Sequence, residues 1–142
     1  MGEARDVVDR FYGSAGAGDL KAVSACFADA CITVTPAGAF DKAEHEAFFG
    51  SFKAALPDAH MTVVRAVESG NEVFVSGRFQ GTHQGDLVTP QGTVPASGNA
   101  LDLPYADYFR VENGEIVEHE VVWDSMTMMA QLGVESGSRQ AL

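Results

Sequence analysis

The chain has 142 residues, enough for one ordinary domain that buries about two-thirds of its unfolded surface. Its 20 acidic and 9 basic side chains give a formal charge of −11, which argues against nucleic acid or an anionic membrane as a partner, because both would be repelled. No apolar run approaches the roughly 20 residues that span a bilayer, and residues 1–6 lack the hydrophobic stretch of a secretory signal, so we expect a cytoplasmic protein.

Three helices and a strand are predicted in the first part of the chain. Apolar residues recur at helical spacing over residues 3–15, and a glycine-rich turn follows. Asp19 is expected to cap a short helix that runs to residue 27. Residues 31–35 are β-rich and predict a strand, whereas residues 41–56 carry apolar side chains on one helical face.

Two cysteines, Cys26 and Cys31, lie in this part among apolar neighbours. They lack the second pair or the histidine spacing that a structural zinc site requires. We therefore expect two buried free thiols and no metal site.

Four strands are predicted in the second half of the chain, over residues 59–67, 71–83, 100–112 and 115–124. Asn113-Gly114 is the two-residue signal of a tight hairpin between the last two strands. Glycines and prolines in residues 84–99 preclude an uninterrupted strand or helix, so we expect a loop there that borders a binding mouth.

This order of elements predicts a single α+β domain over residues 1–142. Helices that precede a run of antiparallel strands pack on one face of the sheet. A strongly curved sheet of this kind closes into a cone. The expected fold is therefore cone-shaped, with three N-terminal helices packed on a strongly curved antiparallel sheet that encloses a pocket.

Asp124 is the leading candidate for chemistry. It lies beside Trp123, where the last predicted strand meets a helix, and a dry, aromatic environment there would raise its pKa. Such an aspartate would act as an acid or a base. The alternative is that Asp124 caps the following helix, since aspartate accepts backbone N–H bonds at that position.

A family resemblance extends over most of the chain. It is carried by residues 7–12 (VVDRFY), 81–85 (GTHQG), 108–114 (YFRVENG) and 123–133 (WDSMTMMAQLG). With these stretches the chain resembles the nuclear transport factor 2-like superfamily, in its SnoaL-like polyketide cyclase branch. The first and third stretches are shared by the whole superfamily and bear only on the fold, whereas the other two are more specific.

The resemblance implies a reaction without a cofactor. In such cyclases, an aspartate at the end of the last strand is the acid and base of an intramolecular aldol ring closure, and Asp124 matches that place. One carboxylate in a dry cavity can shuttle the proton that ring closure requires. The resemblance also implies a small apolar or polycyclic ligand that bears a carbonyl group, no metal, and a homodimer formed through the open sheet face.

Ketosteroid isomerases of the same superfamily provide a second comparison. Asp107 lies where those enzymes hold a protonated carboxylic acid that donates to an oxyanion. Thr35 stands in the place of their general base and Phe11 in the place of their oxyanion tyrosine, so isomerase chemistry of that type is not expected. Thr35 and Phe11 are instead expected to contact the ligand.

Further pocket candidates come from strand alternation. Tyr105 and Asp107 share one face with aromatic residues, which favours a pocket lining. A protonated Asp107 would donate a hydrogen bond to a substrate carbonyl, and the alternative is a buried carboxylate that pairs with a backbone amide or with Arg78. Trp123 and Tyr12 are the remaining candidates for ligand binding.

The histidines are the other titratable candidates. His83 ends a predicted strand and titrates near neutrality, so it is the second catalytic candidate, and an exposed histidine at the start of a loop is the alternative. His45, His60 and His119 lie among acidic residues, which favours a surface role. The phenylalanines and methionines at helical spacing are more typical of a core than of a cavity.

Two other functions stay open at this point. A non-catalytic module that binds a small molecule or a protein is one, because a fold does not fix a function. A hydrolase or dehydratase that acts on a small carbonyl substrate is the other, and it would use the same residues. Convergence of Asp124, Asp107 and His83 on one cavity would favour an enzyme.

Overall fold

A six-stranded sheet determines the architecture of the protein. The computed structural model describes residues 2–89 and 92–134. In these residues the elements are, in chain order, α1 (Glu3–Gly16), α2 (Leu20–Ala25), β1 (Thr33–Thr35), β2 (Gly38–Phe40), α3 (Lys42–Ala55), β3 (His60–Ser69), β4 (Glu72–Thr82), β5 (Leu87–Thr89), β6 (Gly92–Val94), β7 (Ala100–Glu112), β8 (Glu115–Trp123) and α4 (Ser125–Gln131). The large sheet has the strand order β2-β1-β8-β7-β4-β3, and β5 and β6 form a separate hairpin.

Capping side chains determine where α2 and α3 begin. Asp19 Oδ1 accepts the backbone N–H of Ala22 at 3.1 Å. Asp41 and Glu44 form a capping box, in which each side chain accepts the backbone N–H of the other, at 2.8 and 2.9 Å. The three helices predicted from the sequence are confirmed to within two residues at each end. None of the helices in the described residues is long and apolar enough to cross a membrane.

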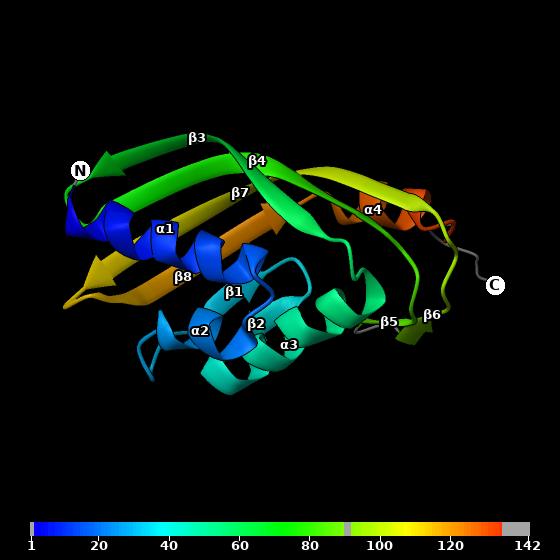
Figure 1. Cartoon of the computed structure of the whole chain (residues 1–142), viewed down its shortest axis with the longest axis horizontal. Coiled ribbons are helices and arrows are strands. Elements are labelled where there is room, and N and C mark those ends of the chain that lie inside the picture. Colours follow the sequence, from blue (N-terminus) through cyan, green and yellow to red (C-terminus); the bar gives the residue numbers. More distant parts are fainter. Residues whose placement is uncertain (1, 90–91, 135–142) are drawn as a thin grey trace.

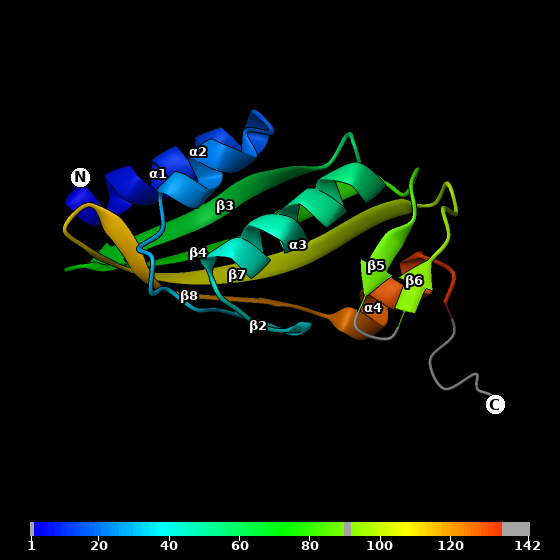
Figure 2. The same ribbon diagram turned by 90° about the horizontal axis from the view of Figure 1, so that it is seen from below.

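The sheet curls around the first three helices. Figures 1 and 2 show α1, α2 and α3 on its concave side, and α4 lies at the far end against β7. Paired strands are antiparallel, except that β1 runs parallel to β8. The chain turns from β7 to β8 at Asn113 and Gly114, whose φ angles of 53° and 77° suit a tight hairpin turn. The predicted α+β fold is confirmed, with one parallel strand pair and a fourth helix.

Short strands are the elements that the sequence analysis did not predict. β2 is an edge strand of three residues, and residues 84–99, expected as a loop, contain the β5–β6 hairpin. Three residues are too few to establish the polar and apolar alternation that identifies a strand. Val88 and Thr89 of β5 border a hollow of about 190 Å³ that also touches Trp123.

Two apolar clusters form the core. The cluster between α1, α2 and the sheet includes Val8, Phe11, Phe27, Phe109 and Ile116. The cluster between the end of α3, α4 and the sheet includes Leu56, Leu87, Leu101, Leu103 and Leu132. Cys26 and Cys31 are buried free thiols, as predicted.

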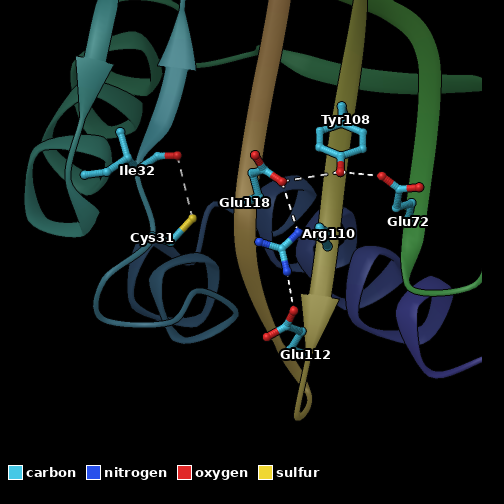
Figure 3. Close-up of polar contacts among 7 residues, drawn as sticks. All are labelled: Cys31, Ile32, Glu72, Tyr108, Arg110, Glu112 and Glu118. Atoms are coloured by element: carbon cyan, nitrogen blue, oxygen red, sulfur yellow. Dashed lines mark hydrogen bonds and ion pairs between the residues drawn. The ribbon is translucent and has the colours of Figure 1, made fainter.

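The convex face of the sheet carries a polar cluster at the hairpin end. Figure 3 shows Tyr108, Arg110 and Glu112 on β7 between Glu72 of β4 and Glu118 of β8. The Tyr108 hydroxyl donates to Glu72 Oε2 at 2.6 Å, and Arg110 Nε donates to Glu118 Oε1 at 3.0 Å. Arg110 also pairs with Glu112. These contacts cross three strands on the convex face and do not reach the concave face.

Candidate functional site

A pocket lies between α1, α3 and the concave face of the sheet. Its larger apolar lining side chains are Phe11, Phe48, Phe49, Phe52, Met61, Phe79, Leu103, Val121, Trp123 and Met128. The space inside that admits the centre of a water-sized sphere is about 140 Å³, many times what one water requires. A cavity of this size and lining suits an apolar organic molecule rather than an ion.

Strand alternation brings polar side chains into this apolar pocket. In β7, Tyr105, Asp107 and Phe109 point to the concave face, and none is more than 6% exposed. The register pairs Asp107 with Val121 and Phe109 with His119 on β8. Asp107 and His119 are therefore diagonal neighbours on adjacent strands, close enough for their side chains to meet.

Asp107 lies at the centre of a buried hydrogen-bond network. The Tyr12 hydroxyl donates to Asp107 Oδ2, and His119 Nε2 lies 2.9 Å from Asp107 Oδ1. His119 Nδ1 lies 3.1 Å from the Thr33 hydroxyl. A neutral His119 with its proton on Nε2 satisfies both contacts, because Nδ1 then accepts from Thr33. The network holds the carboxylate and the imidazole in fixed orientations at the pocket wall.

Two tyrosines in the pocket have pKa values raised well above the ordinary value of a phenol. Burial, followed by the charge of Asp107, raises the pKa of Tyr12 far above its ordinary value of 10.0. Burial also raises the pKa of Tyr105 to about 12, and the charge of Asp107 adds to this rise. Both phenols therefore stay protonated near neutral pH and act as hydrogen-bond donors.

Two buried donors of the pocket lack an acceptor. The Tyr105 hydroxyl and the indole Nε1 of Trp123 have no hydrogen-bond partner among the described residues. A buried polar group without a partner costs free energy, and such groups are normally paired. Since both side chains line the pocket, these donors are suited to the oxygen atoms of a ligand.

His45 is a pocket residue that the sequence analysis assigned to the surface. It is 7% exposed, and its ring lies 5.6 Å from that of His119, measured between centroids. Burial, with a smaller effect of His119, lowers the pKa of His45 to about 3. The imidazole is therefore neutral at physiological pH. Its spacing of three, four and seven residues from Phe48, Phe49 and Phe52 could have placed it on the pocket face of α3.

Asp124 occupies the position of a helix cap rather than that of a pocket acid. Its Oδ1 accepts the backbone N–H of Met126 at 3.0 Å, and its Oδ2 accepts the Thr127 hydroxyl at 2.8 Å. These hydrogen bonds lower the pKa of Asp124, so the expected rise is wrong. The Asp124 side chain is exposed and does not line the pocket. Strand alternation explains this, because Trp123 faces the pocket and the next residue does not.

His83 is buried but lies away from the pocket. It is 0% exposed, which excludes the exposed alternative. Its Nδ1 lies 2.8 Å from the Ser97 hydroxyl, so its contacts are with the segment that leads into β7. The three residues whose convergence would favour an enzyme therefore do not meet, and Asp107 instead meets His119 and Tyr12.

The candidates for ligand binding do come together. Asp107, Trp123, Tyr12, Tyr105, Thr35 and Phe11 all line the pocket. Both oxygens of Asp107 are hydrogen-bonded, to Tyr12 and to His119, and Arg78 pairs with Asp102 rather than with Asp107. That a protonated Asp107 donates to a substrate carbonyl stays a prediction. His60 is exposed as expected, whereas His119 is 3% exposed and belongs to the site.

No group of three or more His, Cys, Asp or Glu side chains in residues 2–89 and 92–134 is arranged to hold a metal ion. That the reaction needs no metal and no organic cofactor stays a prediction from the resemblance. The polar groups that line the pocket are the carboxylate of Asp107, imidazoles, phenols, the indole of Trp123, the Thr35 hydroxyl and the Lys53 ammonium. Such groups bind and orient a ligand, and the carboxylate and imidazoles can also move protons.

Comparison with known proteins identifies what the chain is similar to. A family model described as SnoaL-like polyketide cyclase matches residues 6–132. The structure of IdmH from Streptomyces antibioticus, a proposed polyketide cyclase, is 27% identical, covers 92% of this chain and 99% of its own, and superposes with a TM-score of 0.76. No protein with a curated description matches the chain.

Two further structures share the fold at lower identity. A proposed SnoaL-like polyketide cyclase from Jannaschia sp. CCS1 is 20% identical, with a TM-score of 0.82 over 94% of this chain and 93% of its own. AclR from Streptomyces galilaeus, a proposed hydroxylase, is 18% identical, with a TM-score of 0.80 over 92% of this chain and 96% of its own. Because the two descriptions differ, the fold alone does not select the reaction.

Proposed function

The chain belongs to the SnoaL-like polyketide cyclase family, and from that premise we propose that it is a cyclase-type enzyme that acts by acid and base catalysis, without a cofactor, on an apolar carbonyl compound. The observation that carries the proposal is the carboxylate of Asp107, held by Tyr12 and His119 in the wall of an apolar pocket. The description of IdmH supports the same class of reaction.

Asp107 is the proposed acid and base. It removes a proton from the carbon next to a substrate carbonyl, and the electron pair of that C–H bond forms an enolate. The enolate carbon then attacks a second carbonyl carbon of the same molecule, which forms one C–C bond. Asp107 returns the proton to the new alkoxide. The product is an isomer of the substrate, so no oxidant, reductant or second reactant is required.

Tyr105 and Trp123 are the proposed donors to the substrate oxygens. A buried hydroxyl and a buried indole N–H without partners are suited to stabilise the negative charge that develops on an enolate oxygen. Tyr12 and His119 are positioning residues in this scheme, because they hold Asp107. The apolar walls exclude water and fold the ligand into a reactive conformer.

A non-catalytic ligand-binding module is the second candidate. The observation that favours it is that both oxygens of Asp107 already take part in hydrogen bonds inside the protein. In that case the network would stabilise the fold, and the pocket would only bind. The two candidates differ in whether Asp107 exchanges protons with a bound ketone.

Exchange of the α-protons of 1-tetralone in D2O, followed by NMR, tests the proposal. We expect the protein to accelerate exchange, and Asp107→Asn to reduce the acceleration by about 100-fold, the scale of general acid–base catalysis. Asp102→Asn is the matched control, because Asp102 lies on the same strand, on the convex face, and pairs with Arg78. The Asp102→Asn variant is expected to accelerate exchange of the tetralone protons as much as the wild-type protein does.

The outcomes separate the candidates. Tetralone that binds, as measured by calorimetry, without accelerated exchange would support the binding module. Exchange that Asp124→Asn abolishes and Asp107→Asn does not would return the catalytic role to Asp124. If Asp107 is the base, the Asp124→Asn variant is expected to accelerate exchange of the tetralone protons as much as the wild-type protein does.

We also propose that the protein is a homodimer through the convex face of the sheet. Val34, Val67, Phe74 and Val122 on this face are 45 to 60% exposed, which supports an apolar interface. A cytoplasmic location stays an expectation. A small apolar or polycyclic molecule as the ligand also stays an expectation.

A further inference from the structure

A lysine lies at the rim of the mostly apolar pocket. Lys53, in the last turn of α3, is half-buried and lines the pocket together with His60 and Gly16. Its Cε lies 3.3 Å from where a Cβ of Gly18 would be, so the side chain extends from α3 to the turn between α1 and α2. The Lys53 side chain therefore borders the pocket at the end where α3 approaches the turn after α1.

Lys53 differs from the other two lysines in its partners. Lys21 pairs with Glu46 at 3.1 Å and Lys42 pairs with Asp29 at 3.3 Å. Lys53 donates to the backbone oxygen of Pro57 at 3.1 Å and forms no ion pair with any described residue. An ammonium has three N–H donors, so two remain for other acceptors. This is notable in a chain with 20 acidic side chains.

The carboxylate nearest along the chain to this rim is already engaged. Asp58 accepts the backbone N–H of Thr82 at 2.7 Å and the Thr82 hydroxyl at 2.8 Å. His60 is exposed, and its Nδ1 lies 3.4 Å from the backbone oxygen of Asp58. The ammonium of Lys53 is thus the cationic group at the rim that has no counterion among the described residues.

The interior of the pocket disfavours a negatively charged group, whereas the rim at Lys53 favours one. Asp107 is the carboxylate that lines it, and the remaining walls are mostly apolar. An anionic group placed deep in the pocket would face Asp107 and lose its hydration. An anionic ligand would therefore orient with its charged end at Lys53 and its apolar body inside.

We propose that Lys53 is a specificity residue that binds the carboxylate of an apolar keto acid, whose ketone reaches Asp107 and Tyr105. This inference rests on the proposed function, because it assumes that the pocket takes a carbonyl compound. It narrows the substrate class from apolar ketones to those with a carboxylate at the end remote from the reacting carbonyl.

Calorimetric titration with two ligands that share the same ring system tests the inference. The probes are 6-acetyl-2-naphthoic acid and its methyl ester, which differ in the charge at one end. The wild-type protein is expected to bind the acid about fivefold more tightly than the ester, the scale of a partly exposed ion pair. Added salt is expected to reduce this preference.

Variants of two lysines locate the preference. Lys53→Met is expected to bind acid and ester with similar affinity, and Lys53→Arg to restore the preference. Lys21→Met is the matched control, because it removes the same charge from a lysine that is paired with Glu46 and lies outside the described pocket lining. It is expected to keep the wild-type ratio.

The possible failures are distinguishable. If the ester binds and the acid has no advantage, or if Lys53→Met keeps the ratio, the assignment of Lys53 is wrong and the proposed function stands. If neither probe binds, the proposed ketone pocket is wrong, and the assignment of Lys53 falls with it.

Discussion

Gly77 has no room for a side chain, and replacing it tests how the pocket is built. Gly77 pairs with Val63 of β3 on one side and with Tyr105 of β7 on the other. A Cβ at this position would lie 2.7 Å from the Tyr105 hydroxyl oxygen and closer still to the backbone oxygen of Thr62. Real Cβ atoms essentially never approach within 3.0 Å, so Gly77→Ala must displace the strands or the tyrosine.

The expected cost follows from overpacking. Forcing a methyl group into a filled site typically costs about 1–3 kcal/mol. For a domain of this size each kcal/mol lowers Tm by about 3 °C, so Gly77→Ala is expected to lower Tm by roughly 3 to 9 °C. Because the clash is with Tyr105, the variant is also expected to bind 1-tetralone more weakly.

Thermal and urea unfolding, followed by circular dichroism, measure this effect. Gly13→Ala is the matched control, because an added Cβ meets nothing within 4 Å on the exposed side of α1. Alanine in a helix is more favourable than glycine by about 0.5–1 kcal/mol, so this control is expected to raise Tm. A Gly77→Ala protein that is as stable as the wild type would refute the argument that Gly77 makes room for Tyr105.

Three further predictions concern a cap, a buried histidine and an interface. Asp124→Ala is expected to lower Tm by roughly 2 to 4 °C through loss of the helix cap, with unchanged affinity for 1-tetralone in calorimetry. A loss of that affinity would return Asp124 to the site. The lowered pKa of His45 means that only the unfolded chain takes up a proton near pH 6.5, so the free energy of unfolding should fall as the pH drops from about 6.5 toward about 3. Urea titrations of His45→Phe should show a shallower decline, and an unchanged slope would contradict the assignment. Phe74→Glu is expected to give a monomer in sedimentation experiments, and a wild-type protein that is already monomeric would exclude the proposed dimer.

The fold was predictable because its signals are local and strong. Asp19 and Asp41 mark the helix starts, and Asn113-Gly114 marks the hairpin, each through one or two residues with a known geometric role. The parallel pairing of β1 with β8 was not predictable in this way. It joins residues that are far apart in sequence, and β1 is only three residues long.

The site was predicted only in part, since its central contacts depend on which way side chains point. Asp107 and Tyr12 were correctly placed in the pocket. His119 was assigned to the surface because Glu118 and Glu120 flank it, yet alternation along β8 puts a residue with polar neighbours on the opposite face. Asp124 was proposed from its place beside Trp123 at a strand end and from the resemblance, whereas its side chain caps α4, the alternative that the sequence also left open.

Strand β7 has a consequence for how this protein can diverge. Its odd-numbered side chains from residue 101 to residue 111 are buried on the concave side, whereas the even-numbered ones are more exposed on the other side. Substitutions at odd positions therefore change what fits inside, and substitutions at even positions change what the outer surface meets. Selection can alter the pocket and the outer surface of the sheet separately along one continuous stretch of chain.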